Sequence, residues 1–284
     1  MNRPIAAALT ACMLAASLTA CGGSTSSSTS TTSTDTTAPS KASGSIAAAG
    51  STALLPLVKQ AAQEYQAKFP AINVSVSGGG SRVGITQAAQ KGVDIGDSDI
   101  LAPGEPSLVD HKVAVATFAI VANPAAGVKN LTTAQVRDIF SGKVTNFKQV
   151  GGADQAITVI NRPRSSGTRA VFVANVMGGT EPMEAGTQDS SGTVASMVSS
   201  TPGAISYVST SYVRDGNVLP LAIDGVAPVA TNVTTGTYRF WSYEHMFTNG
   251  APAKDAAAFI AFVQNDTEAL TKLGFIPVSA MKVK

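Results

Sequence analysis

The sequence predicts an α/β protein whose folded part divides into two lobes, each a sheet flanked by helices. Short strand-like segments alternate with helical segments along most of the chain, which is typical of parallel sheets wound with helices. The first 45 of the 284 residues do not resemble a folded domain, and the remaining 239 are enough for two such lobes.

In the first half of the folded part, apolar residues recur at helical spacing in two segments, and Pro56 is acceptable in the first turn of one of them. Three further segments have the alternation or the apolar run expected of strands. The predicted helices are Leu54–Phe69 and Val83–Lys91, and the predicted strands are Ile72–Ser77, Val93–Gly96 and Val113–Val121.

The second half continues the alternation. Thr132 or Thr133 is suited to cap a helix that ends before the turn at Ser141. The predicted helices are residues 132–140, 166–177, 192–199 and 255–264, and the predicted strands are Ile157–Asn161 and Ala204–Val208.

The N-terminus is typical of an exported bacterial lipoprotein. A short basic start precedes the apolar run Ile5–Ala20, which is too short and too rich in Ala to span a membrane comfortably and indicates a signal peptide over residues 1–20. Leu18-Thr19-Ala20-Cys21-Gly22 resembles a lipobox, in which Cys21 becomes lipidated and carries a fatty acid such as palmitate. We therefore expect a membrane anchor at Cys21 on the periplasmic or outer side of the cell.

Residues 21–45 are expected to form a flexible tether. Of the 14 residues from Ser24 to Thr37, 13 are Ser or Thr, and such a segment buries too little apolar area to offset the entropy of ordering it. Cys12 lies in the signal peptide, so the folded part has no cysteine. Disulfides, Cys-ligated metals and thiol catalysis are therefore excluded for that part.

The folded part carries little charge. Removing Arg3, Asp35 and Lys41 from the 38 charged residues leaves 35 in 239, or about 15%, against about 25% in a typical domain. With a net charge of +2 and no basic stripe, the chain is not expected to bind nucleic acid. We expect a monomer.

Three loops share a design suited to an anion: Gly and hydroxyl residues stand immediately before a helix. Helix N-termini offer free N–H groups, and Ser or Thr adds donors without charge. Each loop alone could equally be an ordinary helix cap. The three loops are Gly50-Ser51-Thr52-Ala53, Gly80-Ser81 and Arg162–Arg169.

From Ile46 onward the chain resembles the PstS-type phosphate-binding proteins of bacterial phosphate ABC transporters. The resemblance rests on six motifs: AGSTALLP (49–56), SGGGSRVGITQ (77–87), VDIGDSDI (93–100), LTTAQVRDIFSGKVTNF (131–147), NRPRSSGTRAVF (161–172) and TPGAISYVS (201–209). It implies a two-lobed periplasmic-binding-protein (type 2) fold with the ligand in the cleft between the lobes. The expected boundaries are 46–122 plus 228–284 for lobe I and 123–227 for lobe II, with crossings near Val121–Pro124 and Gly225–Thr231.

The resemblance also implies a phosphate site. Lobe I would contribute donors from Thr52, the N–H of Ala53 and Ser81, together with the carboxylate of Asp99. Lobe II would contribute Arg162 and the triplet Ser166-Gly167-Thr168 at the start of a helix. The loaded protein would close by a hinge motion and dock on the permease subunits of the transporter.

Asp99 and Arg162 are expected to set charge and selectivity. Phosphate retains a P–OH group that can donate to a carboxylate, whereas sulfate at neutral pH has none, so Asp99 would accept from phosphate and repel sulfate. The Arg162 guanidinium is a fork suited to two phosphate oxygens.

The residues argue against an enzyme and against a metal or other cofactor. Only His111 and His245 could serve as a histidine base, and no G-x-S-x-G motif occurs. An S-x-x-K match at Ser279–Lys282 lies at the extreme C-terminus. A calcium loop starting at Asp97 would need Gly at position 102 and Glu at position 108, where the chain has Ala102 and Leu108.

Two alternatives remain, and both are binding proteins. The same fold binds molybdate, tungstate or sulfate, although Asp99 disfavours these fully deprotonated anions. The chain could also be a phosphate-sensing or adhesive surface lipoprotein without a transport role.

Overall fold

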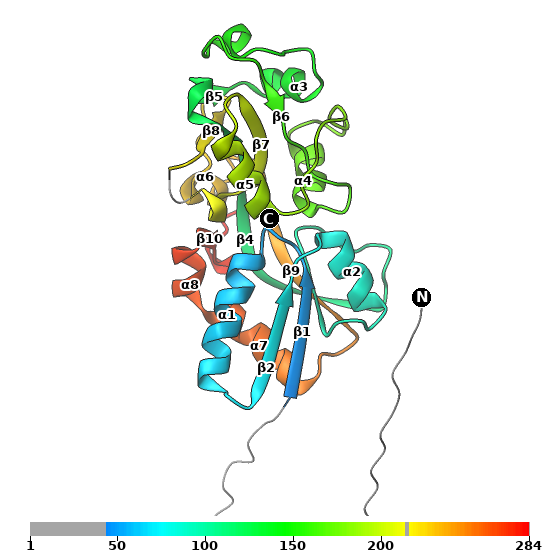
Figure 1. Ribbon diagram of the computed structural model, residues 1–284. Coiled ribbons are helices and arrows are strands. Elements are labelled where there is room, and N and C mark those ends of the chain that lie inside the picture. The colour runs from blue at the N-terminus through cyan, green and yellow to red at the C-terminus, as the bar shows by residue number, and fades with distance from the viewer. Residues whose placement is uncertain (1–43, 214–215, 284) are drawn as a thin grey trace, which may run out of the picture. The chain divides into compact units, whose positions relative to one another are not determined.

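The computed structural model describes residues 44–213 and 216–283, and the strands among them join one mixed ten-stranded sheet (Figure 1). The predicted signal peptide, Cys21 and nearly all of the predicted tether lie outside the described residues. The strands are β1 (Gly44–Gly50), β2 (Ile72–Ser77), β3 (Ile95–Ser98), β4 (Leu108–Ala122), β5 (Asn130–Leu131), β6 (Thr158–Val159), β7 (Ala204–Ser209), β8 (Leu219–Ile223), β9 (Trp241–Asn249) and β10 (Phe275–Ile276).

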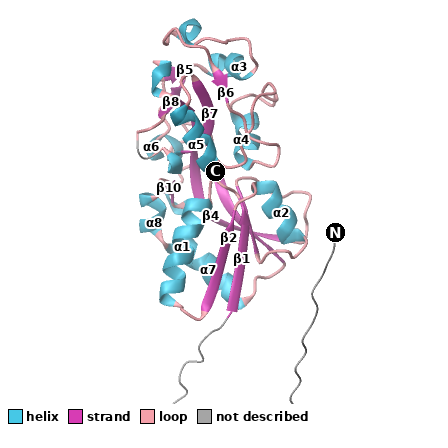
Figure 2. Cartoon of the chain, viewed as in Figure 1, coloured by secondary structure: helices cyan, strands magenta, loops and turns pink. Residues whose placement is uncertain are grey.

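The helices cover the sheet and occupy most of the segments that the sequence predicts (Figure 2). A Thr132 side chain that accepts from the N–H of Gln135 caps α3, as expected. No helix in the described ranges is both long enough and apolar enough to cross a membrane. The α-helices are α1 (Leu55–Lys68), α2 (Ser81–Ala89), α3 (Thr133–Phe140), α4 (Gly167–Asn175), α5 (Ser191–Ser200), α6 (Ala230–Thr234), α7 (Lys254–Asn265) and α8 (Thr267–Lys272).

The expectation of wholly parallel sheets is wrong. β1 runs parallel to β2 and β3, and β6 runs parallel to β7. The long strands β4 and β9 run antiparallel to each other, and they also join the two parallel groups through antiparallel pairs.

β4 changes partners along its length and so links the two lobes. Residues 108–117 pair with β9, beside β3 and β1, whereas residues 118–122 pair with β7 and β8. β9 begins at Trp241. The change of strand partners on β4 therefore falls between Thr117 and Phe118. The lobe crossings expected at 121–124 and 225–231 stay predictions.

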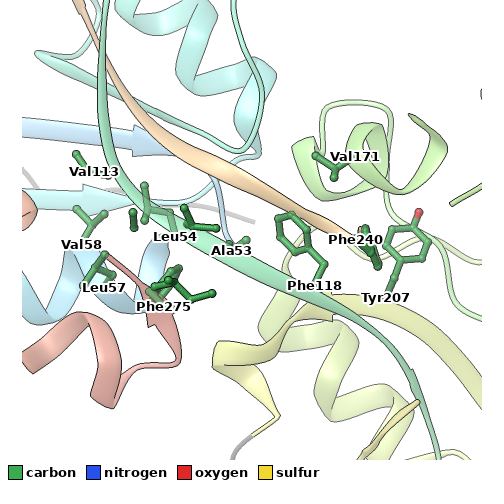
Figure 3. Packing of buried hydrophobic residues seen from close by; sticks show 14 of the residues in the cluster. Ala53, Leu54, Leu57, Val58, Val113, Phe118, Val171, Tyr207, Phe240 and Phe275 are labelled. Atoms are coloured by element: carbon green, nitrogen blue, oxygen red, sulfur yellow. The ribbon is translucent and has the colours of Figure 1, made fainter. Parts of the chain in front are cut away.

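Buried aromatic residues fill the core at this change of partners (Figure 3). The rings of Phe118 and Phe240 lie 5.3 Å apart, and the Tyr238 hydroxyl donates to the carbonyl of Phe118. Farther into the second lobe, Phe172 stacks on Tyr207 with ring centroids 4.2 Å apart. These contacts connect the cores of both lobes at the two strands that link them.

Candidate functional site

Four loops from separate parts of the chain meet in one buried polar cluster. Thr52 precedes α1, Ser81 opens α2, and Asp99 follows β3. Arg162 lies in the loop before α4. Each of these four side chains is at most 4% exposed, so the predicted site residues are brought together and shielded from bulk water.

Asp99 joins the two lobes through its carboxylate. Its Oδ2 accepts a hydrogen bond of 2.7 Å from the Thr168 hydroxyl, and its Oδ1 accepts one from the Ser51 hydroxyl. Its backbone N–H donates to Ser81 Oγ at 2.9 Å. Hydroxyl donors from both lobes thus satisfy both oxygens of this buried side chain.

Arg162 is 1% exposed, and within the described residues its guanidinium donates to neutral oxygens. Nη2 donates to Thr52 Oγ1 at 3.0 Å, and Nη1 donates to Ser191 Oγ at 3.1 Å. Nε and Nη2 also donate to the carbonyls of Gln188 and Asp189. Burial lowers the pKa of the guanidinium, while the charge of Asp99 acts in the opposite direction. A guanidinium without a carboxylate ion pair retains its full attraction for an anionic ligand.

Two glycines allow the lobes to approach this closely. A Cβ on Gly167 would collide with Ser81 Oγ and would lie 2.9 Å from the Cβ of Asp99. Gly80 has φ of 96° and faces the carbonyl of Ser165, which a Cβ would approach to 2.8 Å. Both positions therefore require glycine for contact across the two lobes.

Two predicted site residues form local hydrogen bonds. The N–H of Ala53 donates to Ser51 Oγ at 3.0 Å, and Ser166 Oγ accepts from the N–H of Arg169 at 3.3 Å as the cap of α4. The Ser166 hydroxyl keeps its proton for a further acceptor. Both residues lie beside the cluster, and neither contacts Asp99 directly.

The sequence reasoning missed three residues of the cluster. Ser51 donates to Asp99, and Ser191, the first residue of α5, contacts both Arg162 and Thr52. The Tyr212 hydroxyl donates to the carbonyl of Thr52 at 2.6 Å. The run Asp189-Ser190-Ser191-Gly192 has the same design as the three predicted loops and could have identified Ser191. No comparable signal marks Tyr212.

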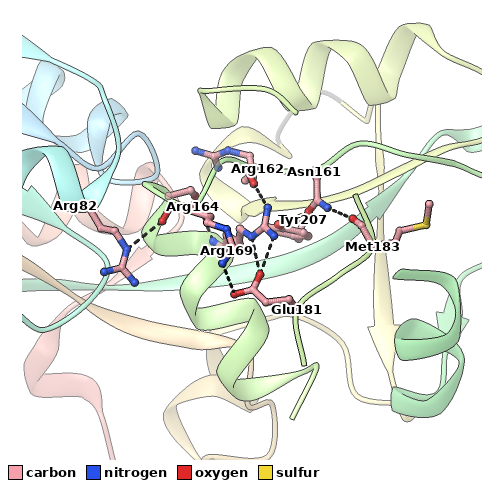
Figure 4. A network of polar contacts seen from close by, with 9 residues as sticks. Arg82, Asn161, Arg162, Arg164, Arg169, Glu181, Met183 and Tyr207 are labelled. Carbon is pink, nitrogen blue, oxygen red and sulfur yellow. Dashed lines mark hydrogen bonds and ion pairs between the residues drawn. The ribbon is translucent and has the colours of Figure 1, made fainter. Parts of the chain in front are cut away.

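The other arginines near the site have supporting roles (Figure 4). Arg169 donates to the carbonyl of Arg162 at 2.6 Å and pairs with Glu181 at 2.8 Å. Arg164 is exposed and lies 3.5 Å from Glu181. Arg82 of α2 donates to the carbonyl of Arg164 across the two lobes. Only Arg162 enters the buried cluster.

Asp97 and Glu244 are buried acids beside Asp99, and both are fully shielded from solvent. Among the described residues, neither carboxyl oxygen of Asp97 has a hydrogen-bond partner, and the same holds for Oε2 of Glu244. Burial raises the pKa of both groups well above their ordinary values, and the charge of Asp99 adds to the effect. Burial therefore favours the neutral form of both side chains.

Replacing Asp97 by Asn should stabilise the protein more as the pH rises. The folded state keeps a proton on Asp97 that the unfolded chain releases above its ordinary pKa of 3.8, so wild-type stability falls with rising pH until the folded carboxyl itself ionises. Urea unfolding at several pH values should show the advantage of Asp97→Asn growing by about 1.4 kcal/mol per pH unit in that range. A difference independent of pH would mean that folded Asp97 is ionised.

Comparisons with known proteins identify the family of this chain. Residues 35–267 match the family model described as a PBP superfamily domain. The phosphate-binding protein PstS of Bacillus subtilis is 44% identical over 251 residues, which cover 86% of this chain and 84% of that protein.

Two solved structures with the same fold are named as phosphate-transport proteins. A putative phosphate ABC transporter substrate-binding protein from Clostridium perfringens, solved with bound phosphate, superposes with a TM-score of 0.78 at 29% identity over 82% of this chain and 99% of that one. An ABC-type phosphate transport receptor from Vibrio cholerae has a TM-score of 0.65 at 30% identity, covering 81% and 99%. The chain therefore belongs to the PBP superfamily and, within it, to the PstS-type family.

Proposed function

We propose that this protein captures inorganic phosphate between its two lobes and delivers it to the permease of an ABC transporter. The observation that carries the proposal is the buried cluster in which one guanidinium, one carboxylate and several hydroxyls from both lobes converge. Family membership supports the same ligand, since relatives and solved neighbours are named as phosphate-binding or phosphate-transport proteins. The proposed role is binding and delivery, not catalysis.

The proposed ligand contacts are the residues that the family resemblance implies: Thr52, Ala53, Ser81, Asp99, Arg162, Ser166, Gly167 and Thr168. We add Ser191, because its hydroxyl accepts from the same guanidinium group. A phosphate bound here would replace hydrogen bonds that now join the lobes directly, such as the one between Arg162 and Thr52. Contacts from both lobes would make the closed form the one that binds most tightly.

We place the hinge where the strand pairing changes. Lobe I would then include β1–β3, the first part of β4 and β9, and lobe II would include β5–β8 with the second part of β4. The two linking strands pass the Phe118–Phe240 contact. Small changes of backbone angle at these two points can rotate one lobe against the other without breaking either core.

Phosphate should bind the protein much more tightly than sulfate, because Asp99 can accept a hydrogen bond only from the protonated anion. Calorimetry at neutral pH measures the gap between the binding free energies of phosphate and sulfate. Asp99→Asn should narrow this gap by several kcal/mol, because an amide can donate a hydrogen bond to sulfate. Asp94→Asn, the same change at an exposed neighbouring residue, should leave the gap unchanged. Equal affinities for the two anions in wild type would contradict the proposed function, and tighter binding of molybdate would favour the alternative of another oxyanion.

Replacing Arg162 by Met should weaken phosphate binding by about 2–5 kcal/mol, the usual cost of removing one partner of a buried charged contact. Arg164→Met is the matched control, and it should change affinity by less than about 1 kcal/mol because that side chain is exposed. Circular dichroism of the free variants checks that they fold. Wild-type affinity in a folded Arg162→Met protein would exclude Arg162 from the site.

We also propose that Cys21 anchors the protein by a lipid on the outer face of the cytoplasmic membrane or beyond it. Cys21→Ser should abolish labelling by a radioactive fatty acid and move the protein from the membrane to the soluble fraction. Labelling that persists in the variant would rule out Cys21 as the lipid site. If the anchored protein binds phosphate but supports no uptake with any co-expressed permease, the sensing or adhesive role would be favoured instead.

A further inference from the structure

Asp97 of β3 and Glu244 of β9 lie on one face of the sheet, and Asp99 follows directly after β3. β3 and β9 are antiparallel, and Asp97 pairs with Met246 while Ser98 pairs with His245. Glu244 lies two residues from Met246, so its side chain shares a face with that of Asp97. Asp99 lies in the bend after Ser98, and its charge acts on both Asp97 and Glu244. Asp97, Asp99 and Glu244 are 0%, 2% and 0% exposed, in that order.

These three carboxyl groups differ in their partners. Asp99 receives hydroxyl donors from Ser51 and Thr168 and lies in the field of Arg162. Among the described residues, Glu244 has one weak contact, a 3.5 Å hydrogen bond from Ser242, and one oxygen without a partner. Adjacent buried carboxyl groups cannot all be ionised, so the proton resides on the groups with the fewest donors.

Metal binding and ion pairing are both disfavoured as roles for these acids. No group of three acidic or histidine side chains in the described part of the chain is placed to share a metal ion. Lys112 lies over the ring of Tyr243, and the one acid nearby on β4, Asp110, is paired with His245 at 2.7 Å. Lys112 and His245 are therefore both engaged with other side chains, and neither of these basic groups is paired with Glu244.

We propose that Glu244 is a positioning residue for ligand selection: its protonated carboxyl group donates a hydrogen bond to Asp99 and holds that carboxylate in the direction that accepts the phosphate proton. Oε2 of Glu244, which has no partner among the described residues, can carry this proton, and the neighbouring Asp99 favours the protonated form of Glu244. This role rests on the proposed function, since it concerns how Asp99 recognises phosphate. Asp97, two residues along the strand, would not be needed for it.

A carboxylate whose oxygens already accept several hydrogen bonds has few lone-pair directions left to accept another. Ser51 and Thr168 each occupy one direction of the Asp99 carboxylate. A third donor from Glu244 would leave a single well-defined direction for the P–OH group. Without that donor, Asp99 could turn and accept from a water molecule, and its discrimination against sulfate would weaken.

The test compares Glu244→Gln with Glu244→Met by calorimetry with phosphate and with sulfate. Gln keeps a neutral donor at nearly the same place, so we expect phosphate affinity and the phosphate-to-sulfate ratio to stay within about threefold of wild type. Met keeps the length but removes the donor, and we expect the ratio to fall by about tenfold or more. Glu184→Gln, at an exposed position, is the control and should leave the ratio unchanged.

A second measurement does not depend on the Met variant folding. Infrared difference spectra of the wild-type protein and Glu244→Gln at neutral pH should show the carbonyl stretch of a neutral carboxylic acid that the variant lacks. Absence of that band, or a wild-type ratio in a folded Glu244→Met protein, would overturn the proposal. If the wild-type protein does not bind phosphate more tightly than sulfate, the proposed function itself is contradicted. A failure of the Glu244 proposal alone leaves that preference intact, so the two failures can be told apart.

Discussion

The contact between the Asp99 carboxylate and hydroxyls from both lobes is the constraint on which the site depends. A buried carboxylate is costly unless donors surround it, and here the donors Ser51 and Thr168 come from opposite sides of the cleft. The same requirement explains why glycine stands at position 167, where any side chain would keep Thr168 away from Asp99. The hydrogen bonds that satisfy Asp99 therefore also join the two lobes, so ligand recognition and lobe closure are coupled.

The low charge of the folded part follows from this arrangement. We propose that hydroxyls, backbone groups at helix starts and one arginine hold the anion. One carboxylate accepts a hydrogen bond from the anion only if the anion carries a proton. Burial favours the neutral form of Asp97 and Glu244, which reduces the repulsion that two further carboxylates next to the site would add. Few charges are needed because each acts in a desolvated setting, where its interactions are strong.

Much of the fold was predictable, because its helices show clear apolar periodicity, as α1 does, or a good N-cap, as α3 does. β9 was missed because Glu244 and His245 interrupt its apolar pattern, and those two residues are buried only through neighbours that the sequence does not reveal. For the same reason the antiparallel pairing of β4 could not be anticipated. The predicted residues Thr52, Ser81, Asp99, Arg162 and Thr168 were found through family motifs, whereas Tyr212 and Glu244 depend on strand register and packing across the lobes.

The most direct measurement is a crystal structure of residues 44–284 with phosphate. We expect one phosphate with one oxygen at hydrogen-bond distance from an Asp99 carboxylate oxygen, two others on the Arg162 guanidinium, and hydroxyl contacts from both lobes. Phosphate bound elsewhere, or bound in this cluster with Asp99 turned away from it and facing water, would contradict the claim that a single carboxylate recognises the proton of the ligand.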